Sequence, residues 1–331
     1  MKISRIDLFD DAVFNAWHAA ASEGVGAGRH DPPLYSAAQS AVAYRATDGP
    51  YDYELYGAVV DGEIVGTVRV ELPKHDNRTL ADIEVAVVPA HRRRGIGSAL
   101  FEHVAERVAE LGRTSILGVV NQPIGADEVP GYAFASKFGL TRRNVEMRRI
   151  LPLPLPEGLL DRLEAKAAAK VGGYRLHAWS GACPEEYAEQ YANLKSLLMS
   201  EAPNGEMDYE PEVWDVARLR ADEKKTEAQG RDLLTVIAVA PGGEIAGHTQ
   251  LALTREGESR VYQWDTLVLP EHRGHRLGLA LKVANLRALV AGYPGRSGVE
   301  TWNAVQNGPM VSVNLELGFR EVERYEEWQR G

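Results

Sequence analysis

The stretch Ile83-Glu84-Val85-Ala86-Val87-Val88-Pro89-Ala90-His91-Arg92-Arg93-Arg94-Gly95-Ile96-Gly97-Ser98 combines three features in a fixed order. An apolar strand ends at a proline, a basic loop with two glycines follows, and a helix is predicted over 97–111. Such a loop presents backbone N–H groups at a helix N-terminus, where the helix dipole also favours an anion. Glycine lets the backbone approach a phosphate closely, because it has no Cβ. The stretch therefore predicts a phosphate-binding loop.

Two better-known phosphate loops do not match this stretch. It lacks the Lys-Ser/Thr ending of a P-loop, and it lacks the third glycine and the acidic ribose-binding residue of the dinucleotide fingerprint. For an isolated Gly-x-Gly, a tight turn with solvated arginines is the favoured interpretation. The same strand–loop–helix pattern recurs 181 positions later, however, at Asp265–Gly278. This recurrence favours the phosphate-binding interpretation.

The recurrence belongs to a duplication of the whole domain. Gly62-Glu63-Ile64-Val65-Gly66 resembles Gly243-Glu244-Ile245-Ala246-Gly247 at the same spacing of 181. Five landmarks sharing one spacing indicate two copies of one domain. They include the pairs Glu84 and Asp265, Pro89 and Pro270, Arg92 and Arg273, and Gly97 and Gly278.

The boundary between the copies is marked by residues 151–156, where leucine and proline alternate. Proline excludes a helix there and favours an extended spacer. A helix rich in Ala, Leu, Lys and Glu is predicted after it, over 158–170. The predicted organisation is domain one over 1–150, a linker and helix over 151–171, and domain two over 172–331.

Each copy is predicted to be a mixed α/β domain, with a central, mostly antiparallel sheet flanked by helices. In copy one, we expect strands at 3–8, 56–60, 64–71 and 80–88, a hairpin turn at Asp61-Gly62, and helices at 12–22 and 97–111. In copy two, we expect strands at 234–240, 244–254 and 259–269, and a helix at 279–291.

Composition limits the partners. The 331-residue chain is 44% hydrophobic and carries a formal net charge of −10, which opposes nucleic-acid binding and permits a cationic amine substrate. No apolar run approaches the ~20 residues that span a bilayer, and the N-terminus is charged where a signal peptide is apolar. We therefore expect a cytoplasmic protein without a membrane partner. The single cysteine, Cys183, predicts neither an internal disulfide nor a metal cluster.

The segment Arg92-x-x-Gly95-x-Gly97 resembles the Q/R-x-x-G-x-G/A motif of the GNAT acetyltransferase superfamily. The resemblance implies that acetyl-CoA, or another acyl-CoA, is the cofactor. Its pyrophosphate would lie on the loop residues Arg92, Arg93, Arg94, Gly95, Ile96, Gly97 and Ser98. Its pantetheine arm would pair with the backbone of Ala86, Val87 and Val88.

Copy two departs from the motif, because Arg276 stands where the first glycine is expected. A non-glycine residue with positive φ there would cost about 1 kcal/mol or more. We still expect copy two to bind CoA. The corresponding residues are Leu267, Val268, Leu269, Arg273, Gly274, His275, Arg276, Leu277 and Gly278.

Amine acylation by a thioester requires a group that removes a proton from the amine. Glu84 and Asp265 occupy equivalent positions inside apolar strands, where desolvation would make a carboxylate hold a proton more readily. Both are therefore candidate general bases. The alternative is a structural carboxylate that pairs with a neighbouring arginine or points to solvent.

The GNAT family often protonates the departing thiolate with the tyrosine of an FYxKxGF segment. That position is Ala135 in copy one, with Tyr132 a possible substitute one turn earlier, and Asn314 in copy two. Asparagine can still donate a hydrogen bond to the sulfur or to CoA. Asn303 is expected where the sheet opens to admit the thioester. Asn307, near a helix start, is either a cofactor contact or a helix cap.

Copy one thus has the better phosphate loop and copy two the better reaction-centre side chains. This division resembles tandem GNAT acetyltransferases of the mycothiol synthase kind, in which the C-terminal copy is active. The leading hypothesis is an N-acetyltransferase that acts on a small-molecule amine, with the chemistry in copy two. The alternatives are a non-catalytic acyl-CoA-binding protein and an aminoacyl-tRNA-dependent transferase. The chain would be a monomer with an internal pseudo-dimer, or a homodimer.

Overall fold

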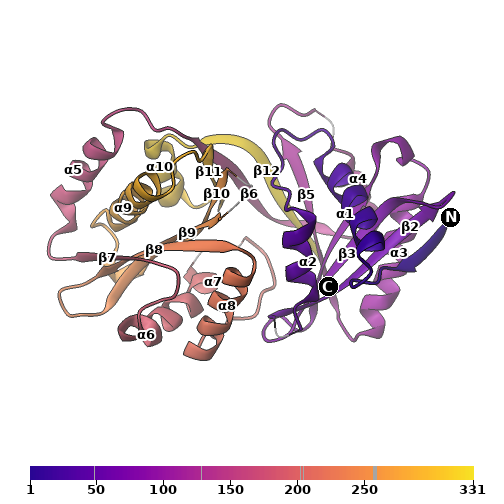
Figure 1. The fold of residues 1–331 in the computed structure, drawn as a ribbon, viewed down its shortest axis with the longest axis horizontal. Coiled ribbons are helices and arrows are strands. Elements are labelled where there is room, and N and C mark those ends of the chain that lie inside the picture. The colour runs from indigo at the N-terminus through magenta and orange to yellow at the C-terminus, as the bar shows by residue number, and fades with distance from the viewer. Residues whose placement is uncertain (48, 128, 202, 204, 256–258) are drawn as a thin grey trace. The chain divides into compact units, whose positions relative to one another are not determined.

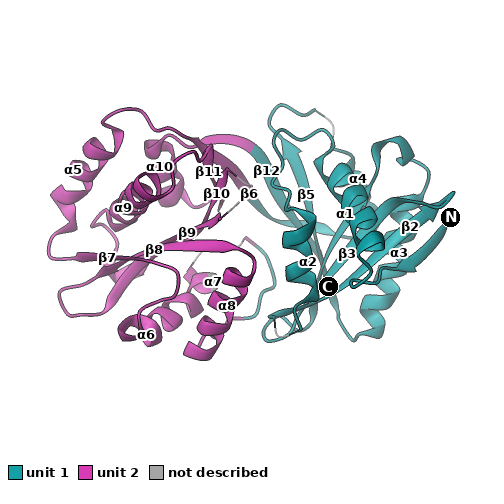
Figure 2. Ribbon diagram, viewed as in Figure 1, with its two compact units in different colours: residues 1–145, 206–210, 323–331 teal, residues 146–205, 211–322 magenta. Residues whose placement is uncertain are grey.

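The computed structural model describes residues 1–47, 49–127, 129–201, 203, 205–255 and 259–331 (Figure 1). The chain divides into two compact units (Figure 2). Unit 1 comprises residues 1–145, 206–210 and 323–331, and unit 2 comprises residues 146–205 and 211–322. Among the described residues, no helix is both long and apolar enough to span a membrane.

Unit 1 is built on a sheet in which β1, β2, β3, β4, β5 and β12 are neighbours in that order. Among the described residues of unit 1, the β4–β5 pair is parallel and the other pairs are antiparallel. The strands are β1 (Lys2–Arg5), β2 (Tyr51–Val60), β3 (Glu63–Pro73), β4 (Leu80–Val87), β5 (Ser115–Pro123) and β12 (Arg320–Arg330). The helices are α1 (Asp11–Gly26), α2 (Ala37–Arg45), α3 (Ile96–Glu110) and α4 (Pro130–Lys137), with the short 3-10 helix η1 (Pro89–His91) after β4.

Unit 2 repeats this plan, with β7, β8, β9, β10, β11 and part of β6 as neighbours in that order. In the part of unit 2 that the structure describes, β10–β11 is parallel and the other pairs are antiparallel. The strands are β6 (Thr141–Pro152), β7 (Arg175–Ser180), β8 (Arg231–Val239), β9 (Ile245–Thr254), β10 (Arg260–Val268) and β11 (Gly298–Ala304). The helices are α5 (Leu159–Val171), α6 (Glu185–Ser196), α7 (Leu198–Glu201), α8 (Val216–Ala228), α9 (Leu277–Gly292) and α10 (Gly308–Leu317), with η2 (Pro270–His272) after β10.

The predicted architecture is confirmed: two α/β domains, each with a mostly antiparallel sheet. The Asp61-Gly62 hairpin is also confirmed, since both residues have positive φ, 53° and 87°, as a tight two-residue turn between twisted strands requires. The first strand is shorter than expected, because β1 ends at Arg5.

Helix periodicity determines where each core lies. In unit 1, Leu100, Val104 and Val108 recur every four residues along α3 and pack on the β3 side chains Val68 and Val70. In unit 2, the α9 side chains Leu279, Val283 and Leu286 occupy the corresponding core. One face of each sheet is therefore covered by the helix that begins at the predicted phosphate loop.

The last strand of each unit comes from the other sequence copy. Glu323–Arg330 of β12 pairs with Ile116–Pro123 of β5 in unit 1, and residues 146–152 of β6 pair with β11 in unit 2. The units therefore differ from the predicted boundaries of 150 and 172. Residues 151 and 152, expected to form a spacer, are strand residues of β6. Repeat landmarks identify the copies along the sequence, whereas hydrogen-bond pairing determines which unit a strand joins.

Candidate active site

In both units the parallel strand pair opens at its carboxyl-terminal end. β4 and β5 pair only from Leu80 with Ser115 to Ile83 with Gly118, and β10 and β11 pair only from Arg260 with Gly298 to Tyr262 with Glu300. β10 also bulges between Gln263 and Thr266. One backbone edge of β4 and of β10 is thus left without a strand partner beyond these points. An extended arm that carries amide groups can pair with such an edge.

The loops that follow these strands share one backbone conformation. In unit 1, Arg93 and Gly95 have positive φ, 60° and 81°. In unit 2, the equivalent residues Gly274 and Arg276 have φ of 88° and 54°. The glycine and the arginine have exchanged places between two left-handed positions. Position 276 does need positive φ, so the predicted conformational strain at Arg276 is present.

The two motif arginines fasten the loop to the strand that precedes it. Arg92 donates from Nε to the Val87 carbonyl (3.0 Å) and from Nη2 to the Gly24 carbonyl (2.8 Å). Arg273 donates from Nε to the Val268 carbonyl (3.1 Å) and from Nη2 to Glu201 (2.9 Å). The sequence suggested charge for a phosphate at these positions, whereas the structure shows a role in holding the turn.

The first turns of α3 and α9 have N–H groups without a side-chain cap, since Gly95 and Arg276 supply none. Orphan N–H groups at a helix N-terminus favour an anion. The other predicted loop residues take several positions. Arg93, Arg94, Gly274 and His275 are exposed, Ile96 and Leu277 are buried in the cores, Ser98 accepts a bond from Lys137, and Gly278 lies in the first turn of α9.

Gly97 has a packing role that the motif did not reveal. A Cβ built there would lie 3.3 Å from the Phe134 ring of α4 and 3.5 Å from Val87. A side chain at this position would therefore push α4 away from α3. The strand residues of the predicted pantetheine contacts lie at the open strand ends, Ala86 and Val87 in β4 and Leu267 and Val268 in β10, with Val88 and Leu269 directly after them.

Glu84 is exposed on β4, so the desolvated environment predicted for it is not found. The carboxylate with a perturbed environment is Asp82, two residues earlier on the same face. Asp82 lies 3.3 Å from Arg69, and burial raises its pKa to about 7, against the opposing effect of that guanidinium. Asp82 was not predicted from the sequence, although strand alternation places it on the same face as Glu84.

Asp265 is half-buried on β10, and its Oδ2 lies 3.2 Å from Nζ of Lys195 on α6. Lys195 is buried, and its side chain is 8% exposed. Burial by itself disfavours the charged amine, but Asp265, Tyr191 and Asp222 together outweigh it and hold the Lys195 pKa above its usual range. The alternative of a paired carboxylate is therefore what the structure shows for Asp265, with lysine in place of arginine.

A buried polar network adjoins this ion pair. The Tyr191 hydroxyl lies 3.1 Å from Nδ1 of His248, and Gln250 donates to Tyr191 (3.4 Å) and to Thr235 (2.9 Å). Burial lowers the His248 pKa to about 4, so its ring is neutral near pH 7. These residues were also missed. The available signal was the four-residue spacing of Tyr191 and Lys195 on α6 and the alternation of His248 and Gln250 on β9.

The asparagines of copy two meet at the open end of β11. Asn303 lies on β11 beyond its last pair with β10, and its Oδ1 accepts a hydrogen bond from Nδ2 of the fully buried Asn314 on α10. Oδ1 of Asn314 has no hydrogen-bond partner among the described residues. Asn307 is the N-cap of α10 and accepts from the Met310 amide (3.4 Å), so the capping interpretation is the one observed.

Among the residues described in copy one, no comparable pair is found. Ala135 is buried in the core of unit 1, and the hydroxyl of Tyr132 lies 2.9 Å from the buried Glu326 carboxylate. Burial, reinforced by Glu326, raises the Tyr132 pKa to about 12. Tyr132 is therefore a poor proton donor at neutral pH.

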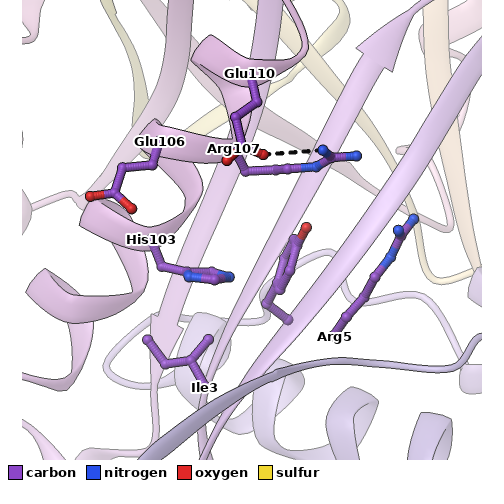
Figure 3. A pocket seen from close by; sticks show the side chains of 7 residues that line it. Ile3, Arg5, His103, Glu106, Arg107 and Glu110 are labelled. Carbon is purple, nitrogen blue, oxygen red and sulfur yellow. Dashed lines mark hydrogen bonds and ion pairs between the residues drawn. The ribbon is translucent and has the colours of Figure 1, made fainter.

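A separate cavity of ≈ 300 Å³ in unit 1 contains none of the predicted site residues (Figure 3). The Glu54 carboxylate offsets the positive charge of Arg107 at this cavity, because Arg107 donates to both Glu54 oxygens (3.0 and 2.8 Å). Tyr56 also donates to Oε2 of Glu54 (2.6 Å). The Arg107 hydrogen bonds help to hold the Glu54 pKa below its usual range. The cavity is lined by Ile3, Arg5, Tyr56, His103, Glu106, Arg107 and Glu110.

Comparison with known proteins agrees with this geometry. Residues 17–128 match the family model described as acetyltransferase (GNAT) family. The chain is 26% identical over 285 residues to a mycothiol acetyltransferase of Salinispora tropica, covering 84% of this chain and 82% of the relative. A relative of the same name from Salinispora arenicola is 27% identical, covering 84% and 81%.

A solved structure extends the likeness to both copies. A tandem GNAT protein from the clavulanic acid biosynthesis pathway superposes with a TM-score of 0.80 at 26% identity, covering 99% of this chain and 98% of that chain. A tandem pair of GNAT-like domains accounts for the sequence duplication, for the strand opening in each unit and for the loop in each unit. The chain therefore contains a GNAT acetyltransferase domain over residues 17–128, has the fold of a tandem GNAT protein, and is an acyltransferase.

Proposed function

We propose that the chain transfers an acetyl group from acetyl-CoA to the amine of a small molecule, and that unit 2 carries out the chemistry. The observation that carries this proposal is the position of Asp265. It lies past the last β10–β11 pair, half-buried, with one carboxylate oxygen anchored by Lys195. Among the described residues, its other oxygen has no hydrogen-bond partner and is available to an incoming amine.

The residues present fit an acyl-CoA in both units. The free edge of β4 or β10 suits the amides of a pantetheine arm, and the uncapped N-terminus of α3 or α9 suits a pyrophosphate. In unit 1, Arg93 and Arg94 are exposed beside that helix start. When bound, acetyl-CoA supplies a thioester whose carbonyl carbon forms the new C–N bond as its C–S bond breaks.

The chain's own residues would handle the amine. The carboxylate of Asp265 would attract an ammonium ion and accept its proton as nitrogen becomes nucleophilic, directly or through a water molecule. Asn314 would hold Asn303 in place through their hydrogen bond, and the half-buried Asn303 amide would offer N–H donors near the departing sulfur.

For unit 1 we propose acyl-CoA binding without turnover. Glu84 is exposed, Ala135 replaces the usual acid, and the Tyr132 hydroxyl contacts Glu326. These observations favour the non-catalytic alternative for this copy alone.

Thiol release from acetyl-CoA across a library of small amines tests the assignment. Asp265→Asn keeps the shape of the side chain and should lower kcat/KM about a hundredfold or more, since general-base catalysis is typically worth that much. Glu84→Gln is the matched control and should retain the activity of the parent. Equal losses in both variants would contradict the assignment to unit 2, and tight CoA binding without turnover for any amine would contradict the enzyme proposal.

The names of two relatives support a small-molecule acceptor. Two curated relatives bear the name mycothiol acetyltransferase. With the acidic net charge of the chain, this favours a small, cationic amine over a protein or nucleic-acid acceptor.

A further inference from the structure

We propose that Lys195 is a positioning residue of the acyl-transfer site. In this role it anchors one oxygen of the Asp265 carboxylate through an ion pair and so fixes which oxygen faces the acceptor amine. The inference rests on the proposed role of Asp265 in unit 2, and it adds a second residue that neither the GNAT motif nor the strand pattern identifies. Lys195 acts through Asp265 and makes no contact with the reacting atoms itself.

The side chains around the Lys195 ammonium form a site that holds one positive charge. Nζ lies 3.2 Å from Oδ2 of Asp265 and 4.6 Å from the centroid of the Trp214 ring, a cation–π distance. Trp214 is itself fixed, because its backbone amide donates to Ser196 (2.8 Å) and its indole Nε1 donates to Glu212 (2.8 Å). The lysine side chain is therefore held in one place.

The neighbouring polar network fixes the helix that carries Lys195. Tyr191 lies one turn earlier on α6, and its hydroxyl contacts His248 and Gln250 of β9. These contacts anchor α6 to the sheet beside Asp265. The arrangement thus restrains both partners of the ion pair, one from the helix and one from the strand.

Other titratable groups face the pair from each adjoining element. His248 on β9 is neutral, since burial lowers its pKa to about 4, and burial raises the pKa of Tyr191 on α6 well above its usual range. Asp222 of α8 favours the charged form of Lys195. The guanidinium carbon of Arg218, also on α8, lies 4.4 Å from the centroid of the Trp214 ring. Among these described groups, Lys195 is the cation in direct contact with Asp265.

Copy one places a cation opposite the equivalent position on a different element. Glu84 faces Arg69 across the β3–β4 pair, and the residue equivalent to Arg69 in copy two is the uncharged Gln250. The strand cation of copy one has thus been replaced by a helix cation in copy two. A helix residue can neutralise the carboxylate from one side, which leaves its second oxygen open toward the strand gap.

The pH dependence of kcat/KM tests this role, because its acid limb reports the ionisation of the free enzyme's base. The measurement uses the full chain, acetyl-CoA and the best amine from the library. Lys195→Met removes the charge that favours the Asp265 carboxylate, so the acid limb should move to higher pH by about one unit or more. Lys195→Arg keeps the charge and should leave the limb where the parent has it.

The controls separate this role from general stability. Arg287→Met breaks an exposed ion pair with Asp161 and Glu164 elsewhere in unit 2, and its profile should match that of the parent. The amine substrate titrates identically in every reaction, so a difference between variants belongs to the enzyme. If Lys195→Met does not fold, Lys195→Gln and a ¹³C NMR titration of the Asp265 carboxyl replace it.

The outcomes distinguish the two proposals. An active Asp265→Asn variant overturns the proposed function whatever Lys195 does. An inactive Asp265→Asn variant, together with a Lys195→Met profile identical to that of the parent, overturns only the role of Lys195. An Arg287→Met shift as large as that of Lys195→Met, or an Asp265 titration unchanged by loss of the lysine charge, also overturns it.

Discussion

Lys282 shows how one residue can differ between copies that otherwise share a plan. In copy one the equivalent residue is Phe101, whose ring stacks on Phe138 with a centroid distance of 4.1 Å. Lys282 is 1% exposed on α9, with Nζ 5.7 Å from the centroid of the Phe319 ring. Burial lowers its pKa to about 7, because the folded state disfavours the charged amine.

This burial predicts a pH-dependent stability. The folded-state pKa lies below the ordinary value of 10.5, so the unfolded chain binds more protons between about pH 7 and 10.5. Burial of the charged Lys282 therefore lowers the free energy of unfolding by its full amount below about pH 7. This loss of stability becomes smaller as the pH rises toward about 10.5. Lys282→Met should raise the Tm strongly at pH 6.5 and weakly at pH 10, at about 1.4 kcal/mol per unit of pKa shift removed.

Thermal unfolding of the variant and of the parent at both pH values measures the difference. Lys224→Met, at an exposed position on α8, is the control and should change the Tm little at either pH. An equal gain at pH 6.5 and pH 10 would show that Lys282 is not a buried cation in the folded state.

At the scale of elements, the strand–loop–helix segment depends on backbone conformation more than on side-chain identity. Both copies place left-handed residues at two positions of the loop, although arginine and glycine occupy them in opposite order. Both copies also use the motif arginine to bind the carbonyl five residues earlier. The loop is therefore a folded unit that exists before any ligand arrives, as an anion site with little reorganisation requires.

A matched pair of glycine substitutions tests the loop. Gly95 and Gly112 precede and follow α3, both have positive φ (81° and 72°), and a Cβ on either meets no atom within 4 Å. Each change to alanine should cost about 1 kcal/mol of stability. Only Gly95→Ala should also weaken acetyl-CoA binding. A loss of about 1.4 kcal/mol in binding free energy would raise the Kd about tenfold.

Calorimetric titration with acetyl-CoA measures this difference, in a background of Asp265→Asn that prevents turnover. Binding that weakens equally in Gly95→Ala and Gly112→Ala would mean that the loop has no special part in holding the cofactor.

For the whole molecule, the exchanged strands determine which residues depend on each other. The C-terminal strand completes unit 1, where Glu323 forms a bidentate pair with Arg29 (2.7 Å for each bond) and Glu327 accepts from Asn144 (2.7 Å). Residues 206–210 of the second copy also belong to unit 1, where Tyr209 donates to Glu327 (3.0 Å). Neither sequence copy therefore contains all the strands of one unit.

A chain that ends at Phe319 should consequently lose order in unit 1 first. It lacks all eight residue pairs between β12 and β5, so the β5 amides should lose hydrogen-exchange protection by an order of magnitude or more, while β9 in unit 2 stays protected. A chain without Gly331 keeps these pairs and is the control. Unchanged β5 protection in the shorter chain would contradict the dependence of unit 1 on the exchanged strand.

The sequence by itself determined the fold class, the duplication and the loop, because these depend on local periodicity, on glycine and proline, and on a spacing of 181 repeated along the chain. It also predicted Asp265 inside a strand, from the repeat spacing, and Asn303 where the sheet opens, from the family resemblance. Contacts between distant segments, and the exposure or burial of single side chains, were decided only by the tertiary structure. These include the Lys195–Asp265 pair, the exposure of Glu84, the half-buried Asp82 and the exchange of β6 and β12. Pairing partners and burial depend on which elements pack together, and a single sequence contains no local signal for that choice.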